Sequence, residues 1–559
     1  MNLEHMKNTI NRRPDIPAIL FFIGMGVILC IVIAVTETQP HHGSPPSTQL
    51  EQDGLRGVST VVGLIGLLAI LAVRRWVNIK PLRFLLKASA VTLVVFAGVS
   101  YFYTTRSLTR RHYLNFHDAF HYFLGCKYIE ETGYNEFYNC YYKALKERED
   151  RRYTPNMRIR NLHDYGYIRI KHAVENADCS KFSKARWEAF KTDSTLFADF
   201  LSDGATRDHG YNGTPLSAAV FGFVANIPKV TYENLVYLTF FDLFALSILF
   251  AVFTWGFGWR MGLLAALFHF VNFGDYYYHV SFFRYWWWVT LGVGITCLHK
   301  EKHGIAALFL VASAMLNVFP VLFIGALGIR ILYTTVKERR LAPLHRTFLI
   351  WSVIGAIAFG GISLTNRNPI EQYEEFFDNM EQHSGLLTGT RAGFRYNFLF
   401  QGVTGEDFLK NPVNIREKYH RNRVAITISA LLLLGLFSLL IVRLDDAQAA
   451  IIGGFALLFF LFSTVRYYYA LAPLLLLLWV NDIKTYRGIL LCALLFFMMS
   501  VVHLAWWRTT FSPFVTNTLY TAMFTLYLGV IFVVLGKRSG LFSSLLSRMK
   551  PAASNQNPA

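Results

Sequence analysis

The chain has 559 residues, of which 53% are hydrophobic and only 16% charged, and its formal net charge is +18. Soluble domains carry about 25% charged residues, so the composition excludes an ordinary soluble protein and indicates one that lies in lipid. The basic excess fits loops that face an anionic membrane leaflet, and no nucleic-acid partner is expected.

Apolar runs of about 17–25 residues can cross a bilayer as helices, and such runs recur along the chain. They predict an all-α polytopic membrane protein with about 11–14 transmembrane helices. The first run resembles a signal peptide but has no convincing cleavage site, so it is interpreted as a retained anchor. The candidate segments begin near Ile16, Val58, Leu85, Leu235, Met261, Phe282, Ile305, Pro320, Phe348, Ala425, Ala449, Tyr467, Ile489 and Thr518.

Basic residues in short loops orient the helices, because lysine and arginine favour the cytoplasmic side. With about fourteen spans, both termini are cytoplasmic and the basic clusters all lie on that side. The clusters comprise Arg12, Arg13, Arg74, Arg75, Lys80, Arg83, Arg260, Lys300, Lys302, Lys337, Arg339, Arg340, Lys484, Arg487, Lys537, Arg538, Arg548 and Lys550.

Two long loops on the outer face divide the spans. Loops of this length usually carry function or their own structure. The predicted organisation is N-terminal transmembrane helices in 1–103, the first outer loop in 104–232, a transmembrane core in 233–364, the second outer loop in 365–423, C-terminal transmembrane helices in 424–536 and a cytoplasmic tail in 537–559.

Both outer loops carry apolar residues at helical spacing, which predicts short amphipathic helices at the membrane interface. Ser183 is a candidate cap for the first helix. The run 215–228 is too short to span, so a surface helix that begins at Pro215 is expected. The apolar residues are Phe190, Phe197, Phe200 and Leu201 in the first loop and Tyr373, Phe376, Phe377 and Met380 in the second.

Three cysteines, Cys126, Cys140 and Cys179, fall in the first outer loop. In an oxidising compartment two of the three can pair, and Cys140 with Cys179 is the preferred pair. No Cys/His spacing resembles a structural zinc site. The chain also lacks a phosphate-binding glycine loop, which argues against nucleotide-driven pumping.

The stretch Asn-Phe-His-Asp-Ala-Phe-His-Tyr at 115–122 places Asp118 between two histidines just outside a predicted span. Apolar neighbours raise the proton affinity of a carboxylate, so Asp118 is expected to act as a general base towards a hydroxyl. The alternative is that it caps a helix or pairs with Arg110 or Arg111.

His117 and His121 are four residues apart and share one face of a helix. This spacing also fits metal ligands. Because no third ligand lies nearby in the sequence, contact with substrate or phosphate is ranked above a metal. Tyr122 joins them as a candidate substrate-binding residue. No cofactor is assigned, and a divalent metal is an option that is not favoured.

A second candidate site is Asp-His-Gly-Tyr-Asn-Gly-Thr-Pro at 208–215. A plain turn followed by a helix explains the glycines and Pro215. It does not explain Asp208 and His209, which lie at the membrane edge and open into the same compartment as Asp118. Both are therefore candidate substrate-binding residues.

Arginines at the outer ends of spans form a third group. Arg284 precedes Tyr-Trp-Trp-Trp, Arg466 precedes three tyrosines, and Arg391 and Arg395 lie in the second outer loop. Each alone fits a membrane anchor whose charged end reaches the interface. Together on one face they favour a phosphate site, because guanidinium groups bind phosphate bidentately.

The order of these features resembles the polytopic glycosyltransferases of the GT-C fold, which take sugars from polyprenyl-phosphate carriers. The shared features are an acidic residue early in a long first outer loop, interfacial helices, a proline-led surface run and a late Arg-Tyr-Tyr segment. The resemblance extends from Tyr103 to Asn481. An uncharacterised bacterial branch has a similar pattern, which here reads Asp118, Phe120, His121, Tyr122, Leu124 and Gly125, followed by Lys127, Tyr128, Gly133 and Tyr134.

The resemblance implies sugar transfer from a polyprenyl-phosphate-linked donor to a lipid or glycan acceptor, with Asp118 as the base and membrane lipids around the protein. It also implies a bacterial inner-membrane location with the active site facing the periplasm. One departure is that many such enzymes carry a second acid just after the arginine, where this chain has Tyr285. Asp208 or Asp275 would then supply that carboxylate.

Two other functions compete with sugar transfer. A transporter or lipid flippase usually places ionisable residues at the membrane midplane and often has repeated halves, whereas the acidic residues here gather in the outer loops. An oligosaccharide ligase is closer, since it also uses polyprenyl-linked donors, but the early acidic loop argues mildly against it.

Overall fold

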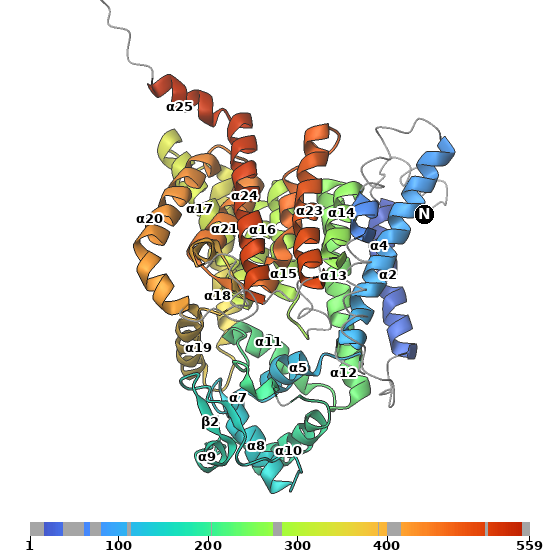
Figure 1. Ribbon diagram of the computed structural model, residues 1–559, viewed down its shortest axis with the longest axis vertical. Coiled ribbons are helices and arrows are strands. Elements are labelled where there is room, and N and C mark those ends of the chain that lie inside the picture. The colour runs from blue at the N-terminus through green and yellow to red at the C-terminus, as the bar shows by residue number, and fades with distance from the viewer. Residues whose placement is uncertain are drawn as a thin grey trace, which may run out of the picture.

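The computed structural model describes residues 16–36, 61–67, 80–108, 113–202, 204–271, 282–388, 391–399, 415–508 and 513–549. Over these residues the chain is nearly all helical, with two small antiparallel strand pairs. Figure 1 shows a bundle of long helices with a smaller group of helices and strands at one end.

Five helical segments among the described residues are long and apolar enough to cross a membrane. The chain is therefore an all-α membrane protein, as its composition predicts. The segments lie in α4 (Lys80–Leu108), α12 with α13 (Tyr232–Leu238 and Phe240–Phe257), α18 (Pro343–Ser363), α20 (Ile415–Ile441) and α24 (Pro513–Arg538).

Further apolar helices fill the bundle between these five. A helix occupies every predicted apolar segment that the structure describes, except the one that begins near Tyr467. These helices are α2 (Ile16–Thr36), α14 (Trp259–Val271), α15 (Trp286–His299), α16 (His303–Leu316), α17 (Val321–Glu338), α21 (Asp446–Leu461) and α23 (Tyr486–Arg508), and α25 (Leu541–Met549) follows α24.

The segment near Tyr467 is not a single spanning helix, because Pro473 interrupts it. Residues Thr464–Val465 form strand β4, Arg466–Leu471 form the 3₁₀ helix η6, and α22 covers only Pro473–Leu477. Pro473 starts α22 because it lacks the N–H that a continuous helix would use there. The backbone before it instead pairs with the second outer loop.

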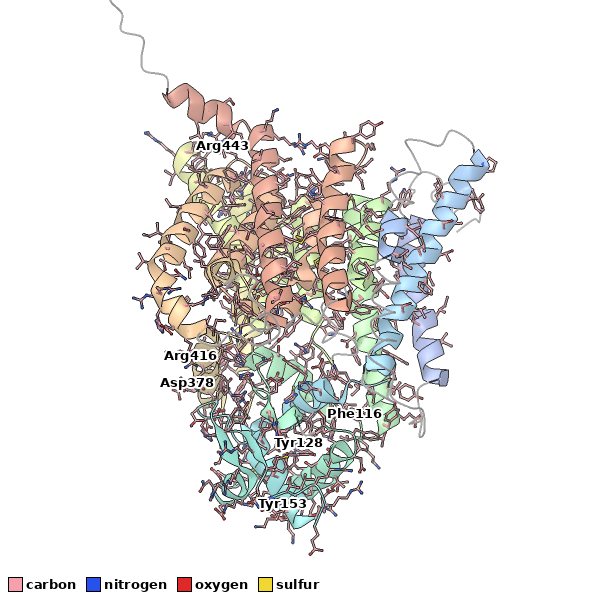
Figure 2. The ribbon with its side chains drawn as sticks, viewed as in Figure 1. Phe116, Tyr128, Tyr153, Asp378, Arg416 and Arg443 are labelled. Atoms are coloured by element: carbon pink, nitrogen blue, oxygen red, sulfur yellow. A yellow bond between two sulfur atoms is a disulfide. The ribbon has the colours of Figure 1, made fainter. Side chains whose placement is uncertain are left out.

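The predicted first outer loop folds into a compact unit, residues 113–202 and 204–226, which is called the loop unit (Figures 1 and 2). Figure 2 places Tyr128 and Tyr153 in it, at the end of the molecule opposite to Arg443. Its elements are α5 (Phe116–Asp118), the π-helical turn η1 (Ala119–Leu124), α6 (Gly125–Lys127), α7 (Ile129–Thr132), α8 (Phe137–Glu147), β1 (Arg158–Arg160), β2 (Tyr167–Arg169), α9 (Ile170–Glu175), α10 (Lys184–Ala198), η2 (Ala205–Arg207) and α11 (Pro215–Asn226).

Local signals in the sequence set the helix starts of this unit. The Ser183 hydroxyl accepts a hydrogen bond from the N–H of Arg186 and caps α10, as predicted. Pro215 occupies the first position of α11, and Thr214 caps it. A Ser or Thr cap satisfies N–H groups that the first helical turn leaves unpaired.

Two ion pairs, of which that between Lys127 and Asp193 is buried, hold α10 against α6 and α7. Lys127 Nζ lies 3.0 Å from Asp193 Oδ2, to which Tyr128 also donates. Arg186 binds Glu131 through two hydrogen bonds and lies over the Tyr128 ring. These contacts fix the helix that carries the site residues against the rest of the unit.

The predicted second outer loop packs on the loop unit through α19 (Pro369–Ser384), the predicted amphipathic helix. The N–H of Tyr134 donates to Glu375 Oε2 at 2.8 Å, and Phe376 packs against Tyr134. Strand β3 (Arg391–Ala392) then pairs antiparallel with β4. The second loop therefore connects the loop unit to the late helices.

One carboxylate joins four helices near Arg443, at the other end of the bundle (Figure 2). Asp446 of α21 accepts from Arg330 of α17 at 2.6 Å and lies 2.8 Å from His303 of α16 and 3.2 Å from His345 of α18. A half-buried carboxylate with three cationic or hydrogen-bonding neighbours is well satisfied, so this cluster acts as a structural clamp.

The predicted disulfide is confirmed, since Cys140 and Cys179 are bonded with their Cα atoms 5.8 Å apart. It joins α8 to the segment before α10. Among the described residues, Cys126, Cys297 and Cys492 are free and buried.

Replacing both Cys140 and Cys179 by alanine is expected to lower the free energy of unfolding of the loop unit by about 4 kcal/mol. The two cysteines are 39 residues apart in the sequence, and without the bond the unfolded chain between them regains the conformational entropy that the bond removes. Thermal unfolding in nanodiscs, followed by near-ultraviolet circular dichroism, measures the change. Reduced wild-type protein should melt like the variant, and an unchanged melting temperature in both would show that the bond contributes nothing.

Candidate functional site

The site is built on the first turns of the loop unit. Asn115 caps α5, and its side chain both accepts from the N–H of Asp118 and donates to Asp118 Oδ2. The chain then continues into the π-helical turn η1. Such turns are rare and often mark functional sites.

Asp118 is buried, with its side chain 2% exposed, and its partner is Arg284. The Arg284 Nη1 atom donates to Asp118 Oδ1 at 3.0 Å, and the arginine side chain is only 8% exposed. The carboxylate therefore sits among polar donors and not only among the apolar neighbours expected from the sequence. Arg110 and Arg111, the alternative partners, lie outside the described residues.

Arg284 also lies between two tyrosine rings. Its guanidinium carbon is 4.3 Å from the ring centre of Tyr122 and 4.9 Å from that of Tyr467. Phe282 and Phe283 directly before it have positive φ angles of 46° and 67°. Bulky residues in this conformation are strained, and such strain collects at functional sites. Here the strained backbone turns the arginine towards Asp118.

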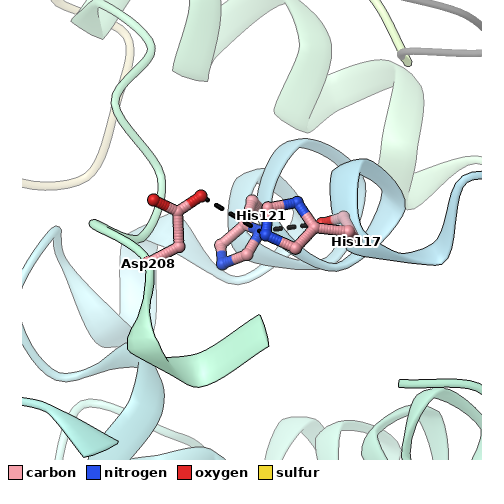
Figure 3. Close-up of side chains that lie close together, drawn as sticks. All are labelled: His117, His121 and Asp208. Carbon is pink, nitrogen blue, oxygen red and sulfur yellow. Dashed lines mark hydrogen bonds and ion pairs between the residues drawn. The ribbon is translucent and has the colours of Figure 1, made fainter. Parts of the chain in front are cut away.

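The histidines gather with Asp208, as Figure 3 shows. His117 Nε2 lies 3.4 Å from Asp208 Oδ2, and His117 Nδ1 lies 3.6 Å from Asp118 Oδ1. The rings of His117 and His121 are 4.6 Å apart, which confirms the shared face. One ligand atom from each of His117, His121 and Asp208 lies within 4.8 Å of the others.

The two histidines have opposite electrostatic surroundings. Burial lowers the pKa of His117, but its polar contact with Asp118 and the charges of Asp208 and Asp118 outweigh burial, so the pKa is raised. Burial and the neighbouring His117 lower the pKa of His121 to about 4. At neutral pH His121 is therefore uncharged, whereas His117 readily carries a proton between two carboxylates.

A cleft lies beside the ion pair, between the loop unit and the bundle. The space between its walls, counted together with its open mouth, is about 470 Å³. The Tyr122 hydroxyl donates to Asn212 Oδ1 at 2.6 Å across one wall. Lining residues include Tyr122, Asn212, Phe221, Arg284, Trp287 and Tyr468.

The structure brings two of the other predicted arginines together and places the third elsewhere. Strand pairing brings the buried Arg391 next to Val465 and so close to Arg466, which is also buried. Arg391 donates to the Ser463 carbonyl. Arg395 instead donates to the Leu461 carbonyl and lies over the ring of Tyr419, so it does not belong to the lining of the cleft.

His209 faces away from the cleft. Its Nδ1 lies 3.2 Å from Asp208 Oδ1, and its ring is 4.7 Å from that of His383 on α19. Burial and the neighbouring His209 lower the pKa of His383 to about 3. The remaining predicted residue, Asp275, lies outside the described residues.

Sequence reasoning missed Asn212, Trp287 and His383. Asn212 lies between Tyr211 and Gly213, in the same stretch as the candidates Asp208 and His209, and this position is the available signal. Trp287 looked like part of an interfacial belt. His383 had no local signal, because only the packing of α19 on the loop unit places it beside His209.

Comparisons of the chain with protein-family models, with curated proteins and with solved structures found no match. The fold defines the class as an all-α membrane protein.

Arg284→Met alone is expected to cost about 3–5 kcal/mol of stability, because it leaves the Asp118 charge buried without its partner. Adding Asp118→Asn should recover part of that loss, so the two substitutions are not additive. Unfolding of both single variants and the double variant in detergent measures the coupling. Purely additive losses would contradict a direct pair.

Proposed function

We propose that the chain is a membrane glycosyltransferase that moves a sugar from a polyprenyl-phosphate carrier to an acceptor hydroxyl at the outer membrane face. The observation that carries this proposal is the buried pair of Asp118 and Arg284 at the edge of an aromatic cleft. It places a proton acceptor and a phosphate-binding cation within one hydrogen bond of each other. Aromatic side chains in the cleft suit the apolar face of a sugar ring.

Arg284 is the group that exchanges partners in this proposal. Asp118 is buried and faces Arg284, whereas Arg284 lines the cleft. A phosphate offers a guanidinium group two strong acceptor oxygens, so a donor in the cleft competes with Asp118 for Arg284. When Arg284 turns to the phosphate, Asp118 becomes available as a base.

The chemistry is then a single displacement. Asp118 takes the proton from the acceptor hydroxyl, the hydroxyl oxygen bonds to the anomeric carbon, and the bond from that carbon to the phosphate oxygen breaks. The electron pair leaves with the phosphate, whose charge Arg284 stabilises. A single displacement inverts the anomeric centre. The phosphate is a weak base, so this reaction needs no strong general acid, in contrast to glycoside hydrolysis.

Arg391 and Arg466 add positive charge near Tyr468, which lines the cleft. Both are buried where strands β3 and β4 pair, next to Tyr467 and Tyr468. Buried cations act more strongly on a nearby phosphate than exposed ones, because water screens them less. Their proposed role is to favour the charged phosphate in the cleft without touching the sugar.

The disulfide supports an outer, periplasmic location for the loop unit in a bacterial inner membrane. Cys140 and Cys179 are bonded in that unit, and disulfides persist in oxidising compartments such as the periplasm. Both termini are then cytoplasmic, in agreement with the basic loops.

Cysteine labelling tests this orientation. Glu175→Cys on α9 is expected to react with a membrane-impermeant maleimide in intact cells, and Arg340→Cys between α17 and α18 only after lysis. Both positions are exposed, and the described free cysteines are buried and give little background. Labelling of Arg340→Cys but not Glu175→Cys in intact cells would reverse the orientation.

A transfer assay tests the activity. In nanodiscs, with a panel of polyprenyl-phosphate sugars and native glycolipid acceptors, Asp118→Asn is expected to lower transfer by about 10²–10⁴-fold, the usual contribution of a general base. Asp199→Asn, which alters an exposed aspartate of the same unit, is the matched control and should retain wild-type transfer. Transfer that survives in folded Asp118→Asn protein would contradict the assignment of the base.

A further inference from the structure

His117, His121 and Asp208 come together from two separate parts of the loop unit (Figure 3). His117 Nε2 and Asp208 Oδ2 are 3.4 Å apart. A tetrahedral ion with bonds of about 2.0–2.1 Å separates its ligand atoms by roughly 3.3 Å. This pair already has that spacing, and small side-chain movements bring the third ligand into range, since all three ligand atoms lie within 4.8 Å of one another.

The hydrogen bonds of His121 define which of its nitrogens can bind an ion. Its Nδ1 lies 2.7 Å from the carbonyl oxygen of His117. A carbonyl can only accept, so Nδ1 carries the hydrogen and Nε2 keeps its lone pair. That lone pair now accepts from the Tyr138 hydroxyl at 2.6 Å.

Tyr138 has a second acceptor for its proton, so it can release His121. Its hydroxyl also lies 3.3 Å from the Ala205 carbonyl oxygen and accepts from the N–H of Gly210. If the hydroxyl turns to Ala205, His121 Nε2 becomes available and no buried polar group loses all its partners.

Two of the three residues also have an outer partner of the kind that orients metal ligands. His121 donates to the His117 carbonyl, and the second oxygen of Asp208 faces His209 at 3.2 Å. His117 Nδ1 lies 3.6 Å from Asp118 Oδ1, which is beyond hydrogen-bonding distance. A metal-binding histidine almost always donates a hydrogen bond from the ring nitrogen that does not bind the metal, and a metal-binding carboxylate also accepts hydrogen bonds. Asp118 is in turn held by Asn115 and Arg284.

We propose that His117, His121 and Asp208 bind one divalent transition-metal ion, of which Zn²⁺ is the best fit. Two imidazoles and one carboxylate favour Zn²⁺ over the hard ions Mg²⁺ and Ca²⁺, which prefer all-oxygen sites. Three protein ligands leave a position open for water or for an oxygen of a bound molecule. The His117 and Asp208 side chains are 35% and 45% exposed, which gives the ion a path to the site.

The competing explanation needs no metal. A proton on His117 also places a positive charge between Asp118 and Asp208. It requires no role for His121 beyond the hydrogen bond that its Nε2 accepts from Tyr138. The two explanations differ in one measurable property, the binding of metal by the purified protein, and this measurement requires no sugar substrate. A failure of the proposed transferase activity is therefore distinguishable from a failure of the metal site.

The test is Zn²⁺ binding by the full chain in nanodiscs, purified with a tag that contains no histidine and stripped with EDTA. Titration calorimetry and elemental analysis should show one Zn²⁺ per chain. His117→Gln and Asp208→Asn should each weaken binding by at least about tenfold, a loss typical of altered metal sites. His163→Gln, an exposed histidine of the same unit, is the matched control and should bind like wild type.

X-ray absorption of the wild-type protein tests the Zn²⁺ ligands directly, even if a variant does not fold. X-ray absorption of the wild-type protein loaded with Zn²⁺ should show two imidazole ligands with oxygen completing the shell. The proposal is overturned if wild type binds no stoichiometric Zn²⁺, and this result would favour the protonated His117. It is also overturned if folded His117→Gln and Asp208→Asn bind Zn²⁺ unchanged, or if the ligand shell of Zn²⁺ contains no histidine.

Discussion

The ion pair between Asp118 and Arg284 is the contact on which the rest of the site depends. It joins the first turn of the loop unit to the start of α15 in the bundle, so neither part can shift without exposing or unpairing a buried charge. Burying two charges costs several kcal/mol each before their attraction offsets it. The additional donor Asn115 and the flanking rings of Tyr122 and Tyr467 reduce that cost.

The His/Asp cluster and the ion pair contain consecutive residues, His117 and Asp118. His117 faces Asp208 through one nitrogen and Asp118 through the other, so it connects the His/Asp cluster to the ion pair. A positive charge in the cluster, whether an ion or a proton, lies close to Asp118 and competes with Arg284 for it. Such a charge favours the release of Arg284 towards a phosphate in the cleft, because charges at these distances interact strongly away from bulk water.

Features that depend on neighbouring residues could be predicted from the sequence. The Ser183 cap, the start of α11 at Pro215 and the amphipathic α19 follow from local hydrogen bonding and helical spacing. Features that depend on distant residues could not. Nothing near Asp118 in the sequence identifies Arg284 as its partner, and nothing near Arg391 identifies its strand pairing with Val465. Asp208 was chosen as a candidate, but its place beside His117 and His121 depends on the fold.

The most direct test of this account is a cryo-electron microscopy structure in nanodiscs with a non-transferable polyprenyl-phosphate sugar. The account predicts phosphate in the cleft within hydrogen-bonding distance of Arg284, with Asp118 released and facing the anomeric carbon of the sugar. A phosphate bound elsewhere while Asp118 and Arg284 stay paired would contradict it.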